Sequence, residues 1–336
     1  MTPAAGTPSP VRAPDISVRY GDAWDLAETL EPASIDCIVT SPPYWGLRDY
    51  GHPEQFGLEP TPQEYVAKLV DLFARLRPAL KDEGTVWLNL GDSYSGTTGR
   101  QTITPQTAYL TGRAGGEPRG PARKTLEYEE SQAGFRDYGH LKPKDLVGIP
   151  WRVAFALQED GWWLRSDIIW AKPNPMPESV TDRPTKSHEY IFLLSKSQRY
   201  YFDQDAVREP SVYPDDNRKA RQKQADYDAM NGQSGQLRAV INPLNARTYP
   251  ERNIRTVWSL STRPYSGAHF AVFPPEIPER CIKAGCPEGG TVLDPFAGSG
   301  TTLEVARKLG RNSIGFELNE EYRALIDDRL KQGVLV

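Results

Sequence analysis

The sequence contains few of the residues that build disulfide frameworks and metal centres. Its 336 residues include only three cysteines and four histidines. Cys37, Cys281 and Cys286 are too few and too scattered for a set of disulfides or a zinc site. Cys37 also lies within a short apolar stretch, where a buried thiol is the expected state. We therefore predict a protein without a metal site, in a reducing compartment such as the cytoplasm.

Long hydrophobic runs and an excess of positive charge are missing as well. No apolar run approaches the roughly 20 residues of a membrane-spanning helix, and residues 1–14 are small and proline-rich, which indicates a disordered tail. The net charge of −4 counts mildly against nucleic-acid binding. Basic residues nevertheless outnumber acidic ones in segments 100–124 and 218–255, so both are candidates for contact with phosphate.

The first hydrophobic segments predict a parallel strand–helix–strand unit. Residues 16–22 and 34–39 are short and rich in β-branched side chains, and residues 23–30 between them fit a helix. Parallel strands joined in this way present their carboxyl ends at one edge of a sheet, where ligands bind. Asp22 and Ser41 should therefore lie at the same edge. The alternative for Asp22 is that its carboxylate only caps the helix.

A stiff polar loop follows the second of these strands. The stretch Thr40–Ser41–Pro42–Pro43–Tyr44–Trp45 contains two consecutive prolines, which remove backbone N–H groups and end the strand. The loop then displays the Ser41 hydroxyl, the Pro42 carbonyl and two aromatic faces. Hydrogen-bond acceptors beside an aromatic face suit a flat heterocycle with an exocyclic amino group. The alternative is an ordinary proline-rich turn.

A glycine-rich turn lies near the other end of the chain. Residues 291–302 are predicted to form a strand, a glycine-rich turn and the start of a helix. The turn has the sequence Asp294–Pro295–Phe296–Ala297–Gly298–Ser299–Gly300. Such a turn lets backbone approach a ligand closely, and the helix N-terminus favours an anionic group. The spacing matches neither the dinucleotide nor the triphosphate pattern. Glu317, one strand–helix–strand unit later, is placed to accept hydrogen bonds from ribose hydroxyls.

Together, the two loops resemble those of the S-adenosylmethionine-dependent DNA amino-methyltransferases. The order, with the acceptor loop first and the cofactor loop last, is similar to that of the β group of this family. A serine at the head of the Pro-Pro-Tyr loop is typical of members that methylate cytosine N4, although some adenine-N6 enzymes also have it. The resemblance implies an α/β fold: a Rossmann-like class I methyltransferase sheet with circularly permuted motif order, an edge antiparallel hairpin and an inserted recognition region.

The resemblance also implies roles for individual residues. Ser41 and the Pro42 carbonyl would accept the protons of the target amine, and Tyr44 would stack on the base. Asp92 would either assist Ser41 or only hold its own turn. In the cofactor site, Asp22 would bind the adenine and Glu317 the ribose. The methionine part would contact Phe273, Asp294, Thr301 and Thr302. The loop itself would contribute Phe296, Gly298, Ser299 and Gly300.

DNA contacts are expected from several segments of low hydrophobic periodicity. The region 204–255 is the expected target-recognition region, with a mobile polar insertion as the alternative, and loop 95–141 would order on DNA. Arginine can bridge guanine O6 and N7, but the sequence does not tell base-reading residues from those that neutralise phosphate. The candidates are Pro43, Trp45, Arg48, Lys172, Asn174, Arg218, Arg221, Arg238, Arg247 and Arg255.

The remaining elements complete the expected catalytic domain, split into residues 15–203 and 256–336. We expect helices over 62–77, 144–159, 275–284, 301–309 and 320–330, strands over 84–94, 161–172 and 312–316, and a hairpin of 188–195 with 199–203. His188 is expected to be structural. The resulting prediction is site-specific cytosine-N4 methylation of duplex DNA by base flipping and in-line transfer. Adenine-N6 methylation and DNA binding without turnover are the alternatives, and a second copy and a cognate restriction endonuclease are further candidate partners.

Overall fold

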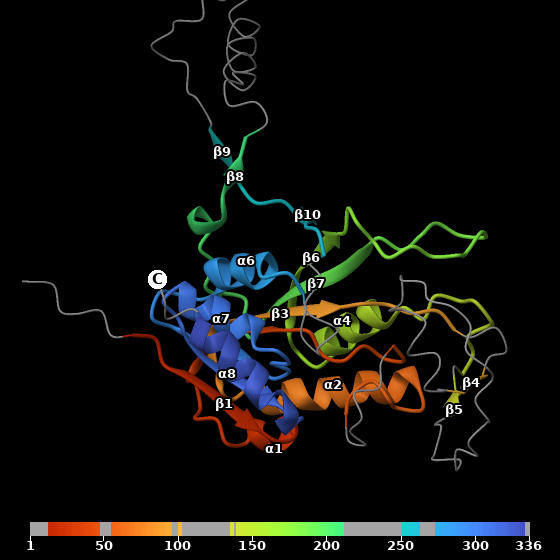
Figure 1. Cartoon of the computed structure of the whole chain (residues 1–336), viewed down its shortest axis with the longest axis horizontal. Helices are drawn as coiled ribbons and strands as arrows, with labels where there is room; N and C mark the ends of the chain where they lie inside the picture. The colour runs from red at the N-terminus through yellow and green to blue at the C-terminus, as the bar shows by residue number, and fades with distance from the viewer. Residues whose placement is uncertain are drawn as a thin grey trace, which may run out of the picture. The chain divides into compact units, whose positions relative to one another are not determined.

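The computed structural model describes most of the chain (Figure 1). The described residues are 13–47, 55–95, 100–102, 135–137, 139–211, 250–262 and 273–332, and for 100–102 and 135–137 only the backbone is considered. Arg48, Arg218, Arg221, Arg238 and Arg247, together with most of the expected tail and of loop 95–141, lie outside this set. None of the helices in the described ranges is long and apolar enough to cross a membrane.

The elements alternate between strand and helix along most of the chain. The strands are β1 (Ile16–Tyr20), β2 (Ile35–Thr40), β3 (Leu80–Leu90), β4 (Arg100–Thr102), β5 (Phe135–Asp137), β6 (Trp163–Ala171), β7 (His188–Ser195), β8 (Glu209–Pro210), β9 (Glu251–Arg252), β10 (Val257–Ser259), β11 (Thr291–Asp294) and β12 (Asn312–Glu317). The helices are α1 (Ala23–Ala27), α2 (Pro62–Leu76), α4 (Ile149–Glu159), α6 (Glu276–Gly285), α7 (Thr301–Lys308) and α8 (Arg323–Gln332), with 3₁₀ turns at Asp205–Val207 and Glu320–Tyr322.

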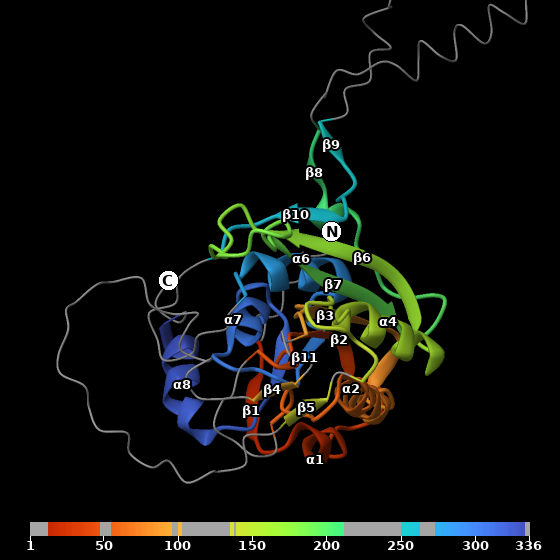
Figure 2. The ribbon, with the colours of Figure 1, turned by 90° about the vertical axis from the view of Figure 1, so that its right-hand side faces the viewer.

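Eight strands form one sheet in the order β1-β12-β11-β2-β3-β7-β6-β10. Every neighbouring pair is parallel except the two pairs that involve β7, and in Figure 2 the arrows of β6 and β7 point in opposite directions. The last two strands of the chain, β11 and β12, lie between the first two, β1 and β2. This interleaving confirms the expected Rossmann-like fold with permuted motif order.

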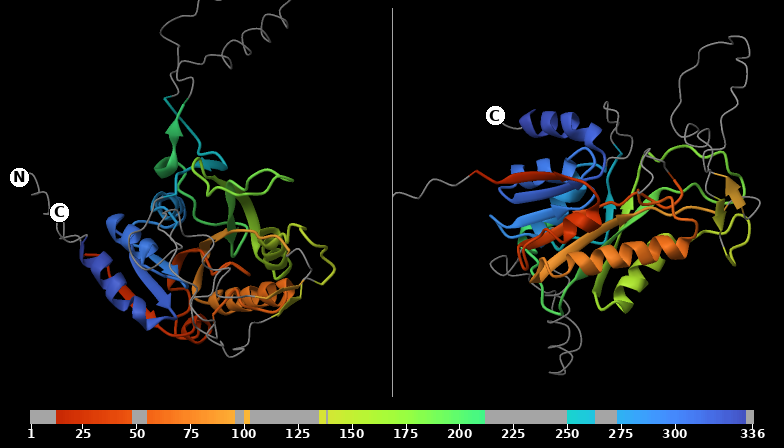
Figure 3. Two further views of the ribbon diagram at one scale, coloured as in Figure 1. Left: turned by 45° about the vertical axis from the view of Figure 1, so that its right-hand side comes forward. Right: turned by 90° about the horizontal axis from the view of Figure 1, so that it is seen from below.

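Helices cover both faces of the sheet. Residues of β3 alternate in direction: Val86, Leu88 and Leu90 join the core cluster that includes α2 and α4, whereas the hydroxyl of Thr85 donates to the Gly285 carbonyl of α6 at 3.1 Å. The helices α2 and α6 therefore pack on opposite faces, as Figure 3 shows. Because both of its faces are covered, β3 is buried from residue 84 to its end.

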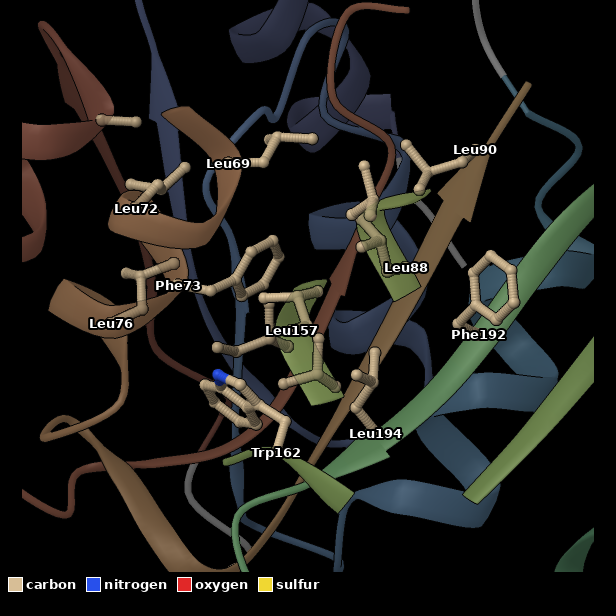
Figure 4. Packing of buried hydrophobic residues seen from close by; sticks show 14 of the residues in the cluster. Leu69, Leu72, Phe73, Leu76, Leu88, Leu90, Leu157, Trp162, Phe192 and Leu194 are labelled. Carbon is tan, nitrogen blue, oxygen red and sulfur yellow. The ribbon is translucent and has the colours of Figure 1, made fainter. Parts of the chain in front are cut away.

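The larger core lies under α2. Thr61 caps this helix by accepting from the Glu64 amide, and Pro62 occupies its first turn, where the predicted helix also begins. Its inward face packs against α4, β3 and β7 (Figure 4). The fully buried side chains of this face are Tyr65, Leu69, Leu72, Phe73 and Leu76. This packing holds β2 and β3 rigidly beneath the loops at their carboxyl ends.

Three expected boundaries are wrong. Residues 199–203 form no strand; β7 pairs instead with β3 and β6, because the sheet offers it two complete backbone ladders. The antiparallel strand therefore lies inside the sheet rather than at its edge. Helix α4 begins at Ile149 rather than 144, since Gly148 adopts a left-handed conformation (φ 78°) that ends the preceding turn. The strand expected over 84–94 spans Leu80–Leu90.

The described residues divide into two compact units, Asp203–Arg255 and the remainder. The smaller unit contains a 3₁₀ turn and the antiparallel pair β8–β9. Within it the Glu209 carboxylate accepts from the guanidinium groups of Arg252 at 2.8 Å and Arg255 at 2.5 Å. Arg255 thus has a partner inside its own unit. The role of this unit in target recognition remains a prediction.

Candidate active site

The two loops singled out in the sequence begin side by side. Strands β2 and β11 are parallel neighbours, with Ile38 opposite Leu293. At their carboxyl ends the Thr40 hydroxyl donates to Asp294 Oδ1 at 2.7 Å, and this bond is buried. It joins residues 254 positions apart in the sequence. The proline loop after β2 and the glycine loop after β11 therefore leave the sheet from adjacent points of one edge.

The glycine loop, residues 295–300, contacts β12, which is the last strand in the sequence. Gly298 and Gly300 have positive φ values of 53° and 79°, which other residues rarely adopt. A Cβ on Gly300 would lie 3.3 Å from the Ile326 side chain. The Gly298 amide donates to Glu317 Oε2 at 2.8 Å. The loop thus places backbone and the Glu317 carboxylate at the same point of the sheet edge.

Glu317 is an acidic group in an unusual environment. Its side chain ends β12, and the residue is 8% exposed. Burial raises its pKa to about 7, although backbone N–H groups of Asn319 and Gly298 act in the opposite direction. Each carboxylate oxygen accepts one of these N–H bonds and keeps a further lone pair for a ligand. A buried carboxylate of this kind suits recognition of hydroxyl donors.

Asp294, Thr301 and Thr302 have partners within the chain, and their direct contacts with a cofactor remain predictions. Asp294 Oδ2 accepts from the Thr302 hydroxyl at 2.6 Å, and Oδ1 accepts from the Phe296 amide at 3.1 Å as well as from Thr40. Burial raises the Asp294 pKa. The Thr301 hydroxyl accepts from the Arg329 guanidinium. These side chains satisfy one another because the sheet edge buries them, and they hold the glycine loop in place.

Aromatic rings lie beside the glycine loop. Phe296 meets Phe56 edge to face at a centroid distance of 5.1 Å, and Phe56 lies 5.5 Å from Trp24. Asp22 accepts from the Trp24 amide at 2.7 Å and so caps α1, which was the alternative considered for it. Phe273 is half-buried in the segment before α6. The loop is therefore lined by apolar rings on the side of α1.

The proline loop is held by its tyrosine. The Ser41 hydroxyl donates to Tyr44 Oη at 3.3 Å, and Tyr44 Oη donates to Glu189 Oε2 at 2.6 Å. Tyr65 donates to the Pro43 carbonyl at 2.9 Å. Burial, followed by the nearby Glu189 charge, raises the Tyr44 pKa well above its ordinary value, so its hydroxyl keeps its proton. The loop is thus rigid on the side of β7.

The Tyr44 ring lies directly over the backbone of Gly91. A Cβ built on Gly91 would come within 2.4 Å of Tyr44 Cε2. We expect Gly91→Ala to displace the ring, to destabilise the protein by about 1–3 kcal/mol as overpacking does, and to slow any reaction that needs Tyr44. Chemical denaturation measures the first effect. In a double-mutant cycle with Tyr44→Ala, the loss should be less than the sum of the single losses; strict additivity would contradict the contact.

Two residues expected at the substrate have partners within the chain. Trp45 is 1% exposed and its indole N–H donates to the Glu59 carbonyl at 2.9 Å, so this ring belongs to the core and not to a DNA surface. Asp92 Oδ1 accepts from the backbone amides of Gly148 at 2.9 Å and Ile149 at 3.0 Å. Asp92 therefore anchors the start of α4, because those amides have no partner within the helix.

The expected DNA contacts in loop 172–177 also have partners within the chain. Lys172 pairs with Glu189 and lies 4.2 Å from the centroid of the Trp170 ring. Asn174 exchanges hydrogen bonds with the backbone of Thr262. The sequence analysis missed Glu189 because its importance depends on which strands are neighbours. The one available signal was its place next to His188 at the start of a strand, and His188 itself packs edge-on against Tyr190.

Comparison with known proteins shows the family of this chain. A family model described as DNA methylase, of the N6/N4 methyltransferases, matches residues 35–328. The chain belongs to the N6/N4 DNA methylase family. Type II methyltransferase M.SmaI of Serratia marcescens is 46% identical over 93% of this chain and 90% of its own length. M.Cfr9I of Citrobacter freundii is 44% identical over 93% and 86%. The resemblance drawn from the two loops is thereby confirmed.

Solved structures share the fold. The PvuII DNA methyltransferase (cytosine-N4-specific) superposes with a TM-score of 0.57, at 18% identity, over 95% of this chain and 89% of that one. A DNA modification methylase of Thermus thermophilus, complexed with S-adenosyl-L-methionine, gives 0.55 at 21% identity over 95% and 94%. Among the described residues of our chain, no group of His, Cys, Asp and Glu side chains could hold a metal ion.

Proposed function

We propose that this protein transfers a methyl group from S-adenosylmethionine to the N4 amine of a specific cytosine in duplex DNA. The observation that carries the proposal is the buried bond between Thr40 and Asp294, at 2.7 Å. It places the Ser41 hydroxyl and the glycine loop at one sheet edge, as a reaction between a base and a cofactor requires. The serine at the head of the proline loop supports cytosine N4 as the target.

The residues around the glycine loop fit the cofactor. S-adenosylmethionine supplies, when bound, a methyl group activated by a sulfonium. Glu317 would accept hydrogen bonds from the ribose hydroxyls, since each of its oxygens keeps a free lone pair. The positive φ values of Gly298 and Gly300 leave the backbone open to close approach. Phe296 offers an aromatic face, which attracts a cation. Asp22 and Phe273 remain candidates for the adenine and methionine parts.

The proline loop would hold the base. A cytosine inside a duplex is out of reach and must be extruded, at a cost of a few kcal/mol. Ser41 Oγ and the Pro42 carbonyl would accept the amine protons and so direct the nitrogen lone pair toward the methyl group. Catalysis then comes mainly from positioning and from acceptors that stabilise positive charge as it develops on nitrogen. No covalent intermediate with the protein is required.

Cofactor affinity should depend on pH through Glu317. Its pKa of about 7 lies above the ordinary carboxyl value, so lowering the pH through 7 protonates the group and removes an ionised acceptor for the ribose hydroxyls. We expect the Kd for S-adenosylmethionine to rise as the pH falls from about 8 to 5, by up to about tenfold per unit below 7. Titration calorimetry measures it. Glu317→Gln should bind weakly at every pH, and a flat wild-type profile would refute the assignment.

The test of the function is direct. Plasmid DNA incubated with the purified protein and S-adenosylmethionine is digested to nucleosides and analysed by mass spectrometry. N4-methylcytosine is the expected product. N6-methyladenine would assign the adenine alternative, which the family includes, and cofactor binding without any methylated base would indicate a binding protein of this fold. Because the relatives are type II enzymes, we further propose a cognate restriction endonuclease that cleaves the same sequence when it is unmethylated.

A further inference from the structure

Glu189 is the end of a chain of hydrogen bonds that starts at the acceptor serine. Ser41 Oγ donates to Tyr44 Oη at 3.3 Å, and Tyr44 Oη donates to Glu189 Oε2 at 2.6 Å. The three residues come from the loop after β2 and from the start of β7, 145 positions away from Tyr44. They meet because β3 lies between β2 and β7 in the sheet. No role in the proposed reaction has yet been given to Glu189.

The two hydroxyl groups in this series of hydrogen bonds, those of Ser41 and Tyr44, donate in the same direction. The Ser41 proton is directed at Tyr44. The Tyr44 proton has two acceptors within reach, Glu189 Oε2 at 2.6 Å and Asn89 Oδ1 at 3.2 Å, and the shorter contact favours Glu189. A hydroxyl has one proton and two lone pairs, so the orientation leaves Ser41 Oγ with lone pairs free for a substrate amine. Hydrogen bonds in a chain also polarise one another. A carboxylate at the far end therefore makes Ser41 a better acceptor than an isolated serine.

The surroundings hold Glu189 in place and balance its charge. The Lys172 ammonium pairs with Oε1, and the two side chains are 18% and 14% exposed. The Asn89 amide donates to Glu189 Oε2 at 3.3 Å and to the Tyr190 carbonyl at 3.0 Å. The lysine therefore offsets the charge of this half-buried carboxylate, and the hydrogen bonds fix its orientation. The same pair directs the Lys172 ammonium toward Glu189.

Resting on the proposed function, we infer that Glu189 is a positioning residue and the final acceptor of the proton that the methylated amine loses. Methyl transfer leaves the amine nitrogen with a positive charge and one proton too many. The N–H bond breaks and its electron pair stays on nitrogen; the proton goes to Ser41 Oγ, the Ser41 proton to Tyr44 Oη, and the Tyr44 proton to the Glu189 carboxylate. Glu189 ends as a neutral acid, and neither hydroxyl is ever ionised.

The strongly raised pKa of Tyr44 is consistent with this route. Tyr44 is a poor acid by itself, because burial and the Glu189 charge both oppose a phenolate. In a relay it accepts one proton as it gives up another, so the phenolate never forms. The same property keeps its hydroxyl protonated and aimed at Glu189 before the reaction.

Two conservative variants test the inference. Tyr44→Phe keeps the ring but breaks the chain, and Glu189→Gln keeps an acceptor for Tyr44 but removes the charge. We expect each to lower kcat by roughly 10- to 100-fold, somewhat less than for a group that contacts the proton directly. KM for DNA, the affinity for S-adenosylmethionine and the fluorescence of 2-aminopurine at the target position should stay at wild-type values. The double variant should be no slower than either single one.

Glu178→Gln is the matched control. Glu178 is also a half-buried carboxylate, paired with Arg183 at 2.6 Å, but contacts no residue of the proline loop in the described structure. It should leave kcat unchanged. A wild-type kcat in either relay variant would overturn the inference. So would a fall in kcat accompanied by changes of similar size in KM for DNA and in the 2-aminopurine signal, because Glu189 would then be a structural residue. A wild-type protein that methylates no base would instead refute the proposed function, so the two failures are distinguishable.

Discussion

Replacing Ser41 with alanine is expected to slow methyl transfer by about 10²–10³-fold, the loss seen when one acceptor or donor of a charge-stabilising site is removed. Ser41 is half-buried at the end of β2, and its hydroxyl is the head of the chain that leads through Tyr44 to Glu189. Without it the amine has only the Pro42 carbonyl as an acceptor, and the proton has no path to Glu189. The fold should survive, since only one hydrogen bond is lost.

Single-turnover kinetics with preformed protein–DNA complex measures this effect without product release. Ser34→Ala is the control: the Ser34 hydroxyl also makes one local bond, to the Glu31 carbonyl at 2.6 Å, but precedes β2 at the opposite end of the strand. It should react at the wild-type rate. Cofactor affinity should be the same in both variants. A Ser41→Ala protein that transfers methyl as fast as wild type would exclude Ser41 from catalysis.

Replacing Asp294 with alanine is expected to destabilise the protein by at least about 3 kcal/mol. Asp294 is 1% exposed and accepts from two hydroxyls and one backbone amide. Its removal leaves the donors of Thr40, Thr302 and Phe296 buried without an acceptor, and each such group costs roughly 1–3 kcal/mol. The glycine loop would also lose its attachment to β2, so S-adenosylmethionine should bind more weakly at any temperature.

Chemical denaturation gives the free energy of unfolding, and calorimetry on the still-folded variant gives the cofactor affinity. Asp25→Ala is the control, because Asp25 is an exposed carboxylate in the first turn of α1 and its loss should change stability by less than about 0.5 kcal/mol. A double replacement of Thr40 and Thr302 by valine should recover part of the loss in the Asp294→Ala background, since the unsatisfied hydroxyls are then absent. Wild-type stability in Asp294→Ala would contradict the linkage of the two loops.

Local sequence patterns predicted where the helices and strands lie better than they predicted which strands pair with one another. The helix α2, the helix after the glycines and the strand that ends at Glu317 all lie where the sequence pattern predicts them. The pairing of β7 was wrong, since a strand of 188–195 reads the same whether its partner is 199–203 or β3 and β6. Backbone hydrogen bonds between strands do not depend on residue type, so only the assembled sheet decides which strands become neighbours.

Within the site, the sequence by itself determined the chemical groups: a serine before two prolines, a glycine turn after an aspartate, and an acidic residue at the end of β12. The types of these residues and their order can be read from short stretches of the sequence. Only the tertiary structure decided which of these side chains contact one another. Asp92, Trp45, Asp294 and Lys172 are candidates along the chain, and the structure gives each a partner 14 to 254 residues away in the sequence. Glu189 likewise became a candidate only in the folded protein, where it accepts hydrogen bonds from Tyr44 and Asn89. Polar groups that are shielded from water need hydrogen-bond partners, and the fold decides which partners are within reach.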